Sequence, residues 1–93
     1  MDKQTEEGGW RGFIRKCLKV KTEEEFNTFF HVFLTAGERE ELAGRYWIIK
    51  ELLKEEKTQR EIAAHYGISI AKISRGSNAL KTIEPNLKKF LEE

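Results

Sequence analysis

Apolar side chains recur along most of this chain at intervals of three and four residues, which is the spacing of one face of an α-helix. Two-residue alternation is never sustained, and turn dipeptides of the hairpin type are absent. The pattern therefore predicts an all-α fold of six helices. The first three are expected over about residues 9–20, 22–34 and 35–54, the fourth and fifth begin near 58 and 70, and the sixth begins near 85.

Short polar residues mark where these helices begin. Three threonines are each followed three residues later by a glutamate, the capping-box spacing: Thr22, Thr35 and Thr58. Ser69 can cap the helix that starts near residue 70, and Pro85 is tolerated in a first helical turn. The caps therefore agree with the helix boundaries that the apolar spacing predicts.

The stretch from Gln59 to Asn78 has the apolar and glycine spacing of a helix-turn-helix. Small Ala63 allows two crossing helices to approach, and Gly67 can adopt the left-handed backbone that ends the first of them. Apolar side chains would hold the pair together: Ile62, Tyr66, Ile68 and Ile73. Polar or small side chains of the second helix would face solvent or a DNA groove: Ala71, Lys72, Ser74 and Arg75.

Positive charge is concentrated on the same stretch. The whole chain has a formal net charge of +1, whereas residues 57 to 81 contain five basic side chains and one acid. Any short αα-hairpin needs a glycine turn and a few buried aliphatic residues, so the motif alone leaves a purely structural role open. Because a basic segment can neutralise phosphates, the coincidence of charge and motif favours binding of double-stranded DNA.

The composition is that of a globular domain, with 93 residues, 39% of them hydrophobic and 35% charged. The longest apolar concentration, residues 26–34, is much shorter than the roughly 20 residues of a membrane span. The start of the chain is polar and acidic, unlike a signal peptide, and one cysteine, Cys17, cannot form an intramolecular disulfide. We expect a single domain over 1–93, located in the cytoplasm, with no membrane partner.

The second and third predicted helices are too apolar for a small monomer. Residues 26–34 and 42–53 place aliphatic and aromatic side chains around most of each helix. Since large exposed apolar patches are rare, pairing with a second copy is expected. A two-fold homodimer would present two reading helices to successive major grooves about 34 Å apart.

The chain resembles the tryptophan operon repressor family. The resemblance covers nearly the whole sequence and is strongest from Gly37 to Lys81, in the segments GERE, ELL, TQREIA and ISRGSNALK. The most specific part is the tetrad that closes the helix-turn-helix stretch, residues 75–78. The resemblance implies an intertwined homodimer, with a core of about 9–56 and 82–93 and a DNA-reading head of about 57–81.

The resemblance also implies L-tryptophan as a corepressor ligand, and no metal. The family's two arginines that sandwich the indole correspond to Arg45 and Arg75, and Arg75 would also pair with the carboxylate. Thr35 would be a nearby hydroxyl donor, and Gly76 would let the ring lie close to the helix. The remaining ligand positions are Val32 and Leu34, whose carbonyls in the other subunit would accept from the ammonium group, and Ala79.

Ala79 departs from the family pattern, because better-known members carry a serine hydroxyl there. One hydrogen bond to the ligand is missing, which costs on the order of 1.5–3 kcal/mol unless water replaces it. We expect the pocket to bind tryptophan still, with altered discrimination against analogues that lack the amino group.

The resemblance also implies which residues contact DNA, and these lie at the starts of the two motif helices. In the first helix they fall on Thr58, Gln59 and Arg60, and in the second on Ser69, Ile70, Ala71, Lys72 and Ser74. Arg60 is the expected base reader, because arginine can bond both acceptors of a guanine edge. Lys72 stands where some relatives have a short hydroxyl residue, so it adds a phosphate contact or shifts operator preference.

The resemblance thus implies a tryptophan-dependent repressor, and the residues themselves do not favour an enzyme. The two histidines, His31 and His65, lie far apart, and no Cys-His zinc spacing or glycine-rich phosphate loop occurs. The main alternative is a ligand-independent helix-turn-helix module like the origin-binding head of a replication initiator. A plain module has no need of Arg45 or Thr35. A protein-interaction adaptor would show no salt-sensitive affinity for DNA.

Overall fold

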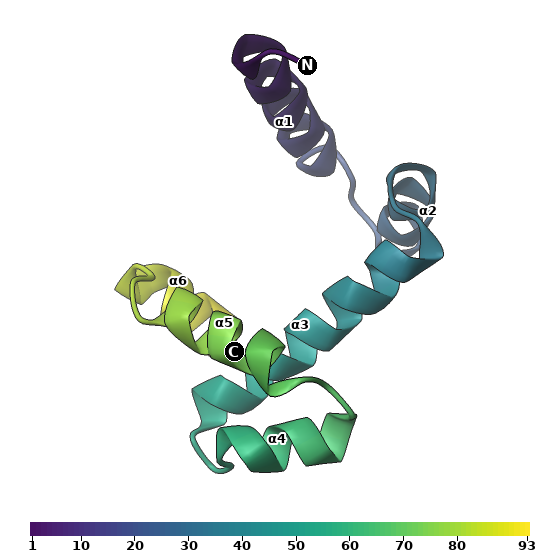
Figure 1. The fold of residues 1–93 in the computed structure, drawn as a ribbon. Helices are drawn as coiled ribbons and strands as arrows, with labels where there is room; N and C mark the ends of the chain where they lie inside the picture. Colours follow the sequence, from purple (N-terminus) through teal and green to yellow (C-terminus); the bar gives the residue numbers. More distant parts are fainter. The chain divides into compact units, whose positions relative to one another are not determined.

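The computed structural model describes residues 1–93 and consists of six α-helices without strands (Figure 1). The helices are α1 (Lys3–Cys17), α2 (Glu23–Phe33), α3 (Ala36–Lys54), α4 (Gln59–Tyr66), α5 (Ile70–Leu80) and α6 (Pro85–Glu92). The prediction of six helices and an all-α fold is confirmed. The boundaries of α2 to α6 agree with those expected from the caps.

The prediction for the first helix was wrong at both ends. The helix begins at Lys3 and ends at Cys17, whereas apolar spacing alone suggested about residues 9–20. Asp2 caps its start, because the carboxylate accepts a hydrogen bond from the Thr5 backbone N–H at 2.7 Å. The first turn of α1 is therefore helical although it lacks the apolar spacing from which the helix was predicted.

The chain divides into two compact units, Met1–Ala36 and Gly37–Glu93. In the first unit, Phe13 of α1 lies against the aromatic side of α2, with ring centroids 5.6 Å from Phe29 and 5.2 Å from Phe33. Trp10, also on α1, is 61% exposed in the single chain. His31 of α2 is exposed as well.

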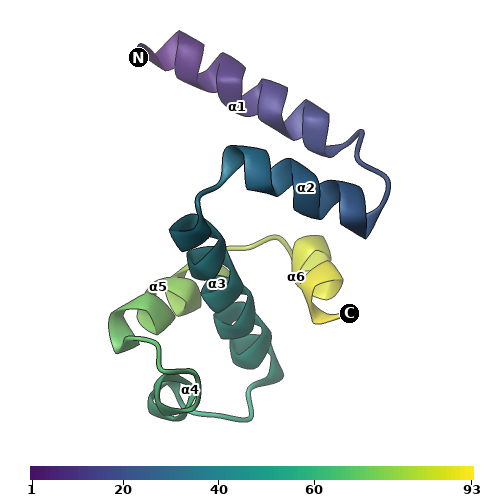
Figure 2. The same cartoon turned by 90° about the vertical axis from the view of Figure 1, so that its right-hand side faces the viewer.

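The core of the second unit lies where α4 and α5 meet α3 (Figures 1 and 2). Ile62 of α4 and Ile73 of α5 are fully buried, and Ile48 of α3 is nearly so. Partly buried residues pack around them: Leu52, Ala63, Tyr66 and Ile68. The apolar positions that the sequence selected to join α4 and α5 are confirmed.

The connection between α4 and α5 has the predicted geometry. Thr58 and Glu61 form a complete capping box at the start of α4, with reciprocal hydrogen bonds of 3.1 and 2.9 Å. Gly67 adopts the left-handed conformation (φ 64°, ψ 37°), and the Ser69 hydroxyl accepts from the backbone N–H of Lys72 at 3.3 Å. These caps fix where α5 begins relative to α4.

A buried carboxylate stabilises the connection between α3 and α4, and no sequence pattern predicts it. Glu51 of α3 is 3% exposed and accepts hydrogen bonds from Lys57 Nζ at 2.7 Å and Lys54 Nζ at 3.4 Å. Between these lysines, Glu55 has a positive φ of 56°, which is unusual for a residue other than glycine. Lys57 immediately precedes the cap of α4, so Glu51 holds the start of α4 against α3.

We expect Glu51→Gln to lower the free energy of unfolding at neutral pH and to have less effect in acid. The hydrogen bond from Lys57 holds the pKa of Glu51 below its ordinary value of 4.5, so its stabilising contribution is present above that pH. As pH falls through the lower folded-state pKa, this contribution is lost. Urea unfolding between pH 6 and 3 should therefore show the two stability curves converging.

Glu92→Gln, at the exposed end of α6, is the control for removing one carboxylate from the chain. It should leave the pH dependence of unfolding unchanged. A constant difference in stability between the natural protein and Glu51→Gln at every pH would contradict the assigned role of the Glu51 charge.

Candidate ligand pocket and nucleic-acid interface

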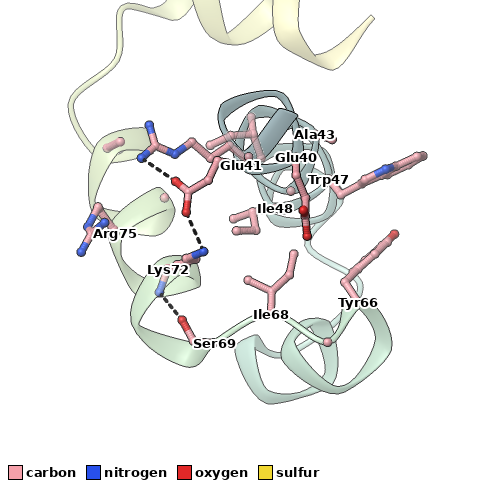
Figure 3. Close-up of a pocket in the computed structure, with 17 residues that line it drawn as sticks. Glu40, Glu41, Ala43, Trp47, Ile48, Tyr66, Ile68, Ser69, Lys72 and Arg75 are labelled. Carbon is pink, nitrogen blue, oxygen red and sulfur yellow. Dashed lines mark hydrogen bonds and ion pairs between the residues drawn. The ribbon is translucent and has the colours of Figure 1, made fainter. Parts of the chain in front are cut away.

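A cavity of about 730 Å³ lies within the second unit (Figure 3). Its walls come from α3, from the α4–α5 turn and from α5. The lining residues are Gly37, Glu40, Glu41, Ala43, Gly44, Arg45, Trp47, Ile48, Ile49, Tyr66, Gly67, Ile68, Ser69, Lys72, Arg75, Gly76 and Ala79. This volume is in the range of small-molecule sites, and the lining combines an apolar floor with several charged groups.

The close approach of α5 to α3 at one wall depends on Gly76. A Cβ atom at this position would lie 2.9 Å from Ile48 Cγ2 and 3.6 Å from Leu52 Cδ1, both on α3. The first distance is shorter than van der Waals contact allows. The family resemblance explains this glycine by contact with a ligand ring, and the structure adds a packing reason that needs no ligand.

A carboxylate on α3 joins the two helices that form the cavity. Glu41 Oε1 accepts a hydrogen bond from Lys72 Nζ of α5 at 2.9 Å, and Glu41 Oε2 lies 3.6 Å from Arg45 Nη2. The hydrogen bond and charge of Lys72, followed by the charges of Arg45 and Arg75, hold the pKa of Glu41 below its usual range. The cavity therefore contains an ionised acid between two of its cations.

Four of the residues expected to bind a ligand line this cavity: Arg45, Arg75, Gly76 and Ala79. Arg45 lies on the α3 wall and is engaged with Glu41, whereas the side chain of Arg75 points away from that carboxylate (Figure 3). The two guanidinium groups thus come from opposite helices.

The other three expected ligand residues lie in the first unit and do not line the cavity. Val32 is in the last turn of α2 and is 78% exposed, while Leu34 and Thr35 follow that helix. The resemblance assigns Val32 and Leu34 to a pocket of the other subunit. That assignment stays a prediction.

The residues expected to contact DNA gather at the N-terminal ends of α4 and α5. Arg60 and Ala71 are exposed, and Ile70 is 44% exposed. The two helix starts are joined, because the Ser74 hydroxyl of α5 donates to Gln59 Oε1 of α4 at 3.0 Å. Thr58 and Ser69 act as helix caps, and their hydroxyls accept backbone hydrogen bonds. Backbone N–H groups at helix starts attract phosphate, so these two ends can form one anion-binding surface.

Lys72 is exposed, as expected, but its ammonium group also has a partner on α3. Its side chain is 51% exposed, and its ammonium group is paired with Glu41 (Figure 3). The sequence offered one signal for Glu41, its four-residue spacing from Arg45 on a helix. Its pairing with Lys72 depends on tertiary structure, which spacing does not reveal.

The side chains that commonly ligate metals are dispersed over the fold. The chain has no group of three or more histidine, cysteine, aspartate or glutamate side chains that could hold a metal ion. No helix has both the length and the apolar character needed to cross a membrane.

Comparison with known proteins identifies related sequences over almost the whole chain. The family model described as "Trp repressor protein" matches residues 8–93. A Trp operon repressor homolog of Chlamydia caviae is 54% identical over 92 residues, covering 99% of this chain and 91% of that protein. Homologs from Chlamydia trachomatis serovar L2 (50%, 98% of this chain and 97% of that protein) and Haemophilus influenzae (34%, 90% and 83%) also match.

Proposed function

Because this chain belongs to the Trp repressor family, we propose that it is a transcriptional repressor that binds a near-palindromic operator as a homodimer when L-tryptophan occupies the cavity. One observation carries the proposal. The cavity has walls from both α3 and α5, and α5 also carries the residues expected to contact DNA. A ligand in the cavity would therefore touch the helix whose position determines DNA binding.

The chemistry of the cavity suits a zwitterionic aromatic ligand. Guanidinium planes can stack on an indole ring, which is the role proposed for Arg45 and Arg75. Arg75 makes none of the ion pairs that engage Arg45 and Lys72, so its guanidinium can pair with the ligand carboxylate. The apolar floor formed by Ile48 and Ile49 would cover the ring edge.

The α4–α5 pair is proposed to be the helix-turn-helix that enters the major groove. Support comes from the left-handed turn at Gly67, the buried contact of Ile62 with Ile73, and the exposed Arg60 at the start of α4. Arg60 would read a guanine edge, while the start of α5 would position the head on the phosphates.

Homodimer formation is supported by the apolar surface of the single chain. The only buried hydrophobic residues are Ile48, Ile62 and Ile73. Leu18, the C-cap of α1, remains exposed. So do large side chains on α1, α2 and α6: Trp10, Val32, Phe33, Leu87 and Phe90. A second copy that covers these faces would bury the apolar area that a stable small domain needs. Sedimentation at micromolar concentration should give a dimer, and a 10.9 kDa monomer would contradict this part of the proposal.

The proposed mechanism is a population shift. Without ligand the two heads of a dimer sample several spacings, and tryptophan favours the spacing that fits successive grooves. For this to occur, the ligand must bind the DNA-competent arrangement more tightly than the others. High tryptophan would then silence genes for making or acquiring it.

Selection from a random duplex library, with and without L-tryptophan, tests this function and assumes no operator sequence. With tryptophan the protein should enrich a near-palindrome whose half-sites are about one helical turn, or about 34 Å, apart. Equal enrichment without tryptophan would favour a ligand-independent DNA-binding module. Enrichment of no sequence under either condition would contradict operator binding.

A further inference from the structure

The contact between Glu41 and Lys72 lies where the proposed ligand and DNA sites meet. Lys72 is the third residue of α5, in the first turn of the helix, where backbone N–H groups and the helix dipole attract phosphate. Its ammonium group is not directed outward from this turn. It lies 2.9 Å from Glu41 Oε1, on α3 (Figure 3).

We propose that Glu41 limits the DNA affinity of the reading head, because its carboxylate competes with the DNA phosphate for Lys72. The inference rests on the proposed DNA-binding function. A carboxylate and a phosphate offer an ammonium group the same chemistry, anionic oxygen acceptors, so Lys72 can bind only one of them fully. Glu41 thereby lowers the affinity of the head for DNA of any sequence.

Glu41 does not hold Lys72 so strongly that a DNA phosphate is excluded. Both side chains of the pair are about half exposed, at 51% for Lys72 and 49% for Glu41, so water and salt screen their attraction. A phosphate can therefore displace Glu41. The second oxygen of Glu41 lies 3.6 Å from Arg45 Nη2, which keeps the carboxylate beside the cavity after Lys72 has left. A retained carboxylate would then repel the nearby phosphate backbone.

Glu40 provides a matched control on the same helix. It is exposed, lines the same cavity and carries the same charge, but it does not form the ion pair with Lys72. Removing either charge weakens general repulsion of DNA by the protein. Only removal of the Glu41 charge releases Lys72, so its effect should depend on Lys72.

The test is a titration of a selected duplex over a range of salt concentrations, with the full chain and five variants: Glu41→Gln, Glu40→Gln, Lys72→Gln, Glu41→Gln/Lys72→Gln and Glu40→Gln/Lys72→Gln. Thermal unfolding confirms that each variant folds. Glu41→Gln should increase affinity by about 2- to 30-fold for a dimer with two heads. In the Glu41→Gln background, Lys72→Gln should reduce the salt dependence of log K by about one ion per head.

The double variant determines whether the gain arises from Lys72. The inference predicts that Glu41→Gln adds little DNA affinity in the Lys72→Gln background. The effect of Glu40→Gln should be the same in the natural protein and in the Lys72→Gln background. Unchanged or weaker DNA binding by Glu41→Gln would overturn the inference and indicate that the pair positions α5. An equal gain in the absence of Lys72 would also overturn it.

The same titrations separate this inference from the proposed function. If tryptophan leaves the DNA affinity of the natural protein unchanged, the corepressor proposal fails, while the competition for Lys72 is judged from the variants alone. If DNA affinity responds to tryptophan but Glu41→Gln shows no gain, only the inference fails. Absence of salt-sensitive DNA binding in every protein would contradict both.

Discussion

Arg75→Ala is expected to weaken L-tryptophan binding by about 10- to 150-fold and to remove the effect of tryptophan on DNA affinity at moderate ligand concentration. The reason is that a hydrogen bond to a charged group contributes about 1.5–3 kcal/mol, and Arg75 is the cavity cation left available for the ligand carboxylate. Loss of ring stacking adds to the effect. Isothermal titration with L-tryptophan measures the ligand affinity directly.

Arg60→Ala is the matched control, because it removes an exposed arginine of α4 that does not line the cavity. It should lower DNA affinity while leaving tryptophan binding unchanged. The two variants therefore separate the ligand site from the DNA site. If Arg75→Ala binds tryptophan as tightly as the natural protein, the proposed ligand site is in the wrong place.

Gly76→Ala is expected to lower the free energy of unfolding by about 1–3 kcal/mol, which is the usual cost of overpacking. The added methyl group would lie 2.9 Å from Ile48 Cγ2. Ile48 is almost fully buried, and its β-branched side chain has little rotational freedom about χ1. To relieve this contact α5 must move away from α3. Urea denaturation measures the loss of stability, and DNA affinity should fall with it because α5 carries the reading surface.

Gly44→Ala tests the same change on the facing helix. A Cβ atom there would lie 3.6 Å from Ile68 Cδ1, an ordinary contact, and Gly44 is inside α3 where alanine is favoured by about 0.5–1 kcal/mol. Stability should therefore rise or stay unchanged. If Gly76→Ala is as well tolerated as Gly44→Ala, the close approach of α5 to α3 does not require glycine.

The elements of the second unit could be predicted from the sequence because their signals are local. A capping box, a glycine in a left-handed turn and a few apolar positions each depend on residues within one or two helical turns. Thr58, Gly67 and Ile73 behave as these rules require. The start of α1 was missed because its first turn is stabilised by Asp2 and has no apolar periodicity.

The site was only partly predictable. Arg45 and Arg75 were selected by resemblance, and both line one cavity. The tertiary ion pairs of Glu41 and Glu51 were not anticipated, because each joins α3 to a residue beyond the end of that helix. The exposure of Trp10 and Trp47 in the single chain was not predictable either, since residue type predicts that an aromatic side chain is apolar but not which partner covers it.

Titration of one selected duplex with the natural protein at fixed salt, in the presence and absence of saturating L-tryptophan, tests the central claim most directly. We expect tryptophan to tighten DNA binding by about 5- to 150-fold, the usual range of coupling between two sites. By the same coupling, the duplex should tighten tryptophan binding by an equal factor. Equal DNA affinity with and without tryptophan would contradict the account, even if the duplex is bound tightly.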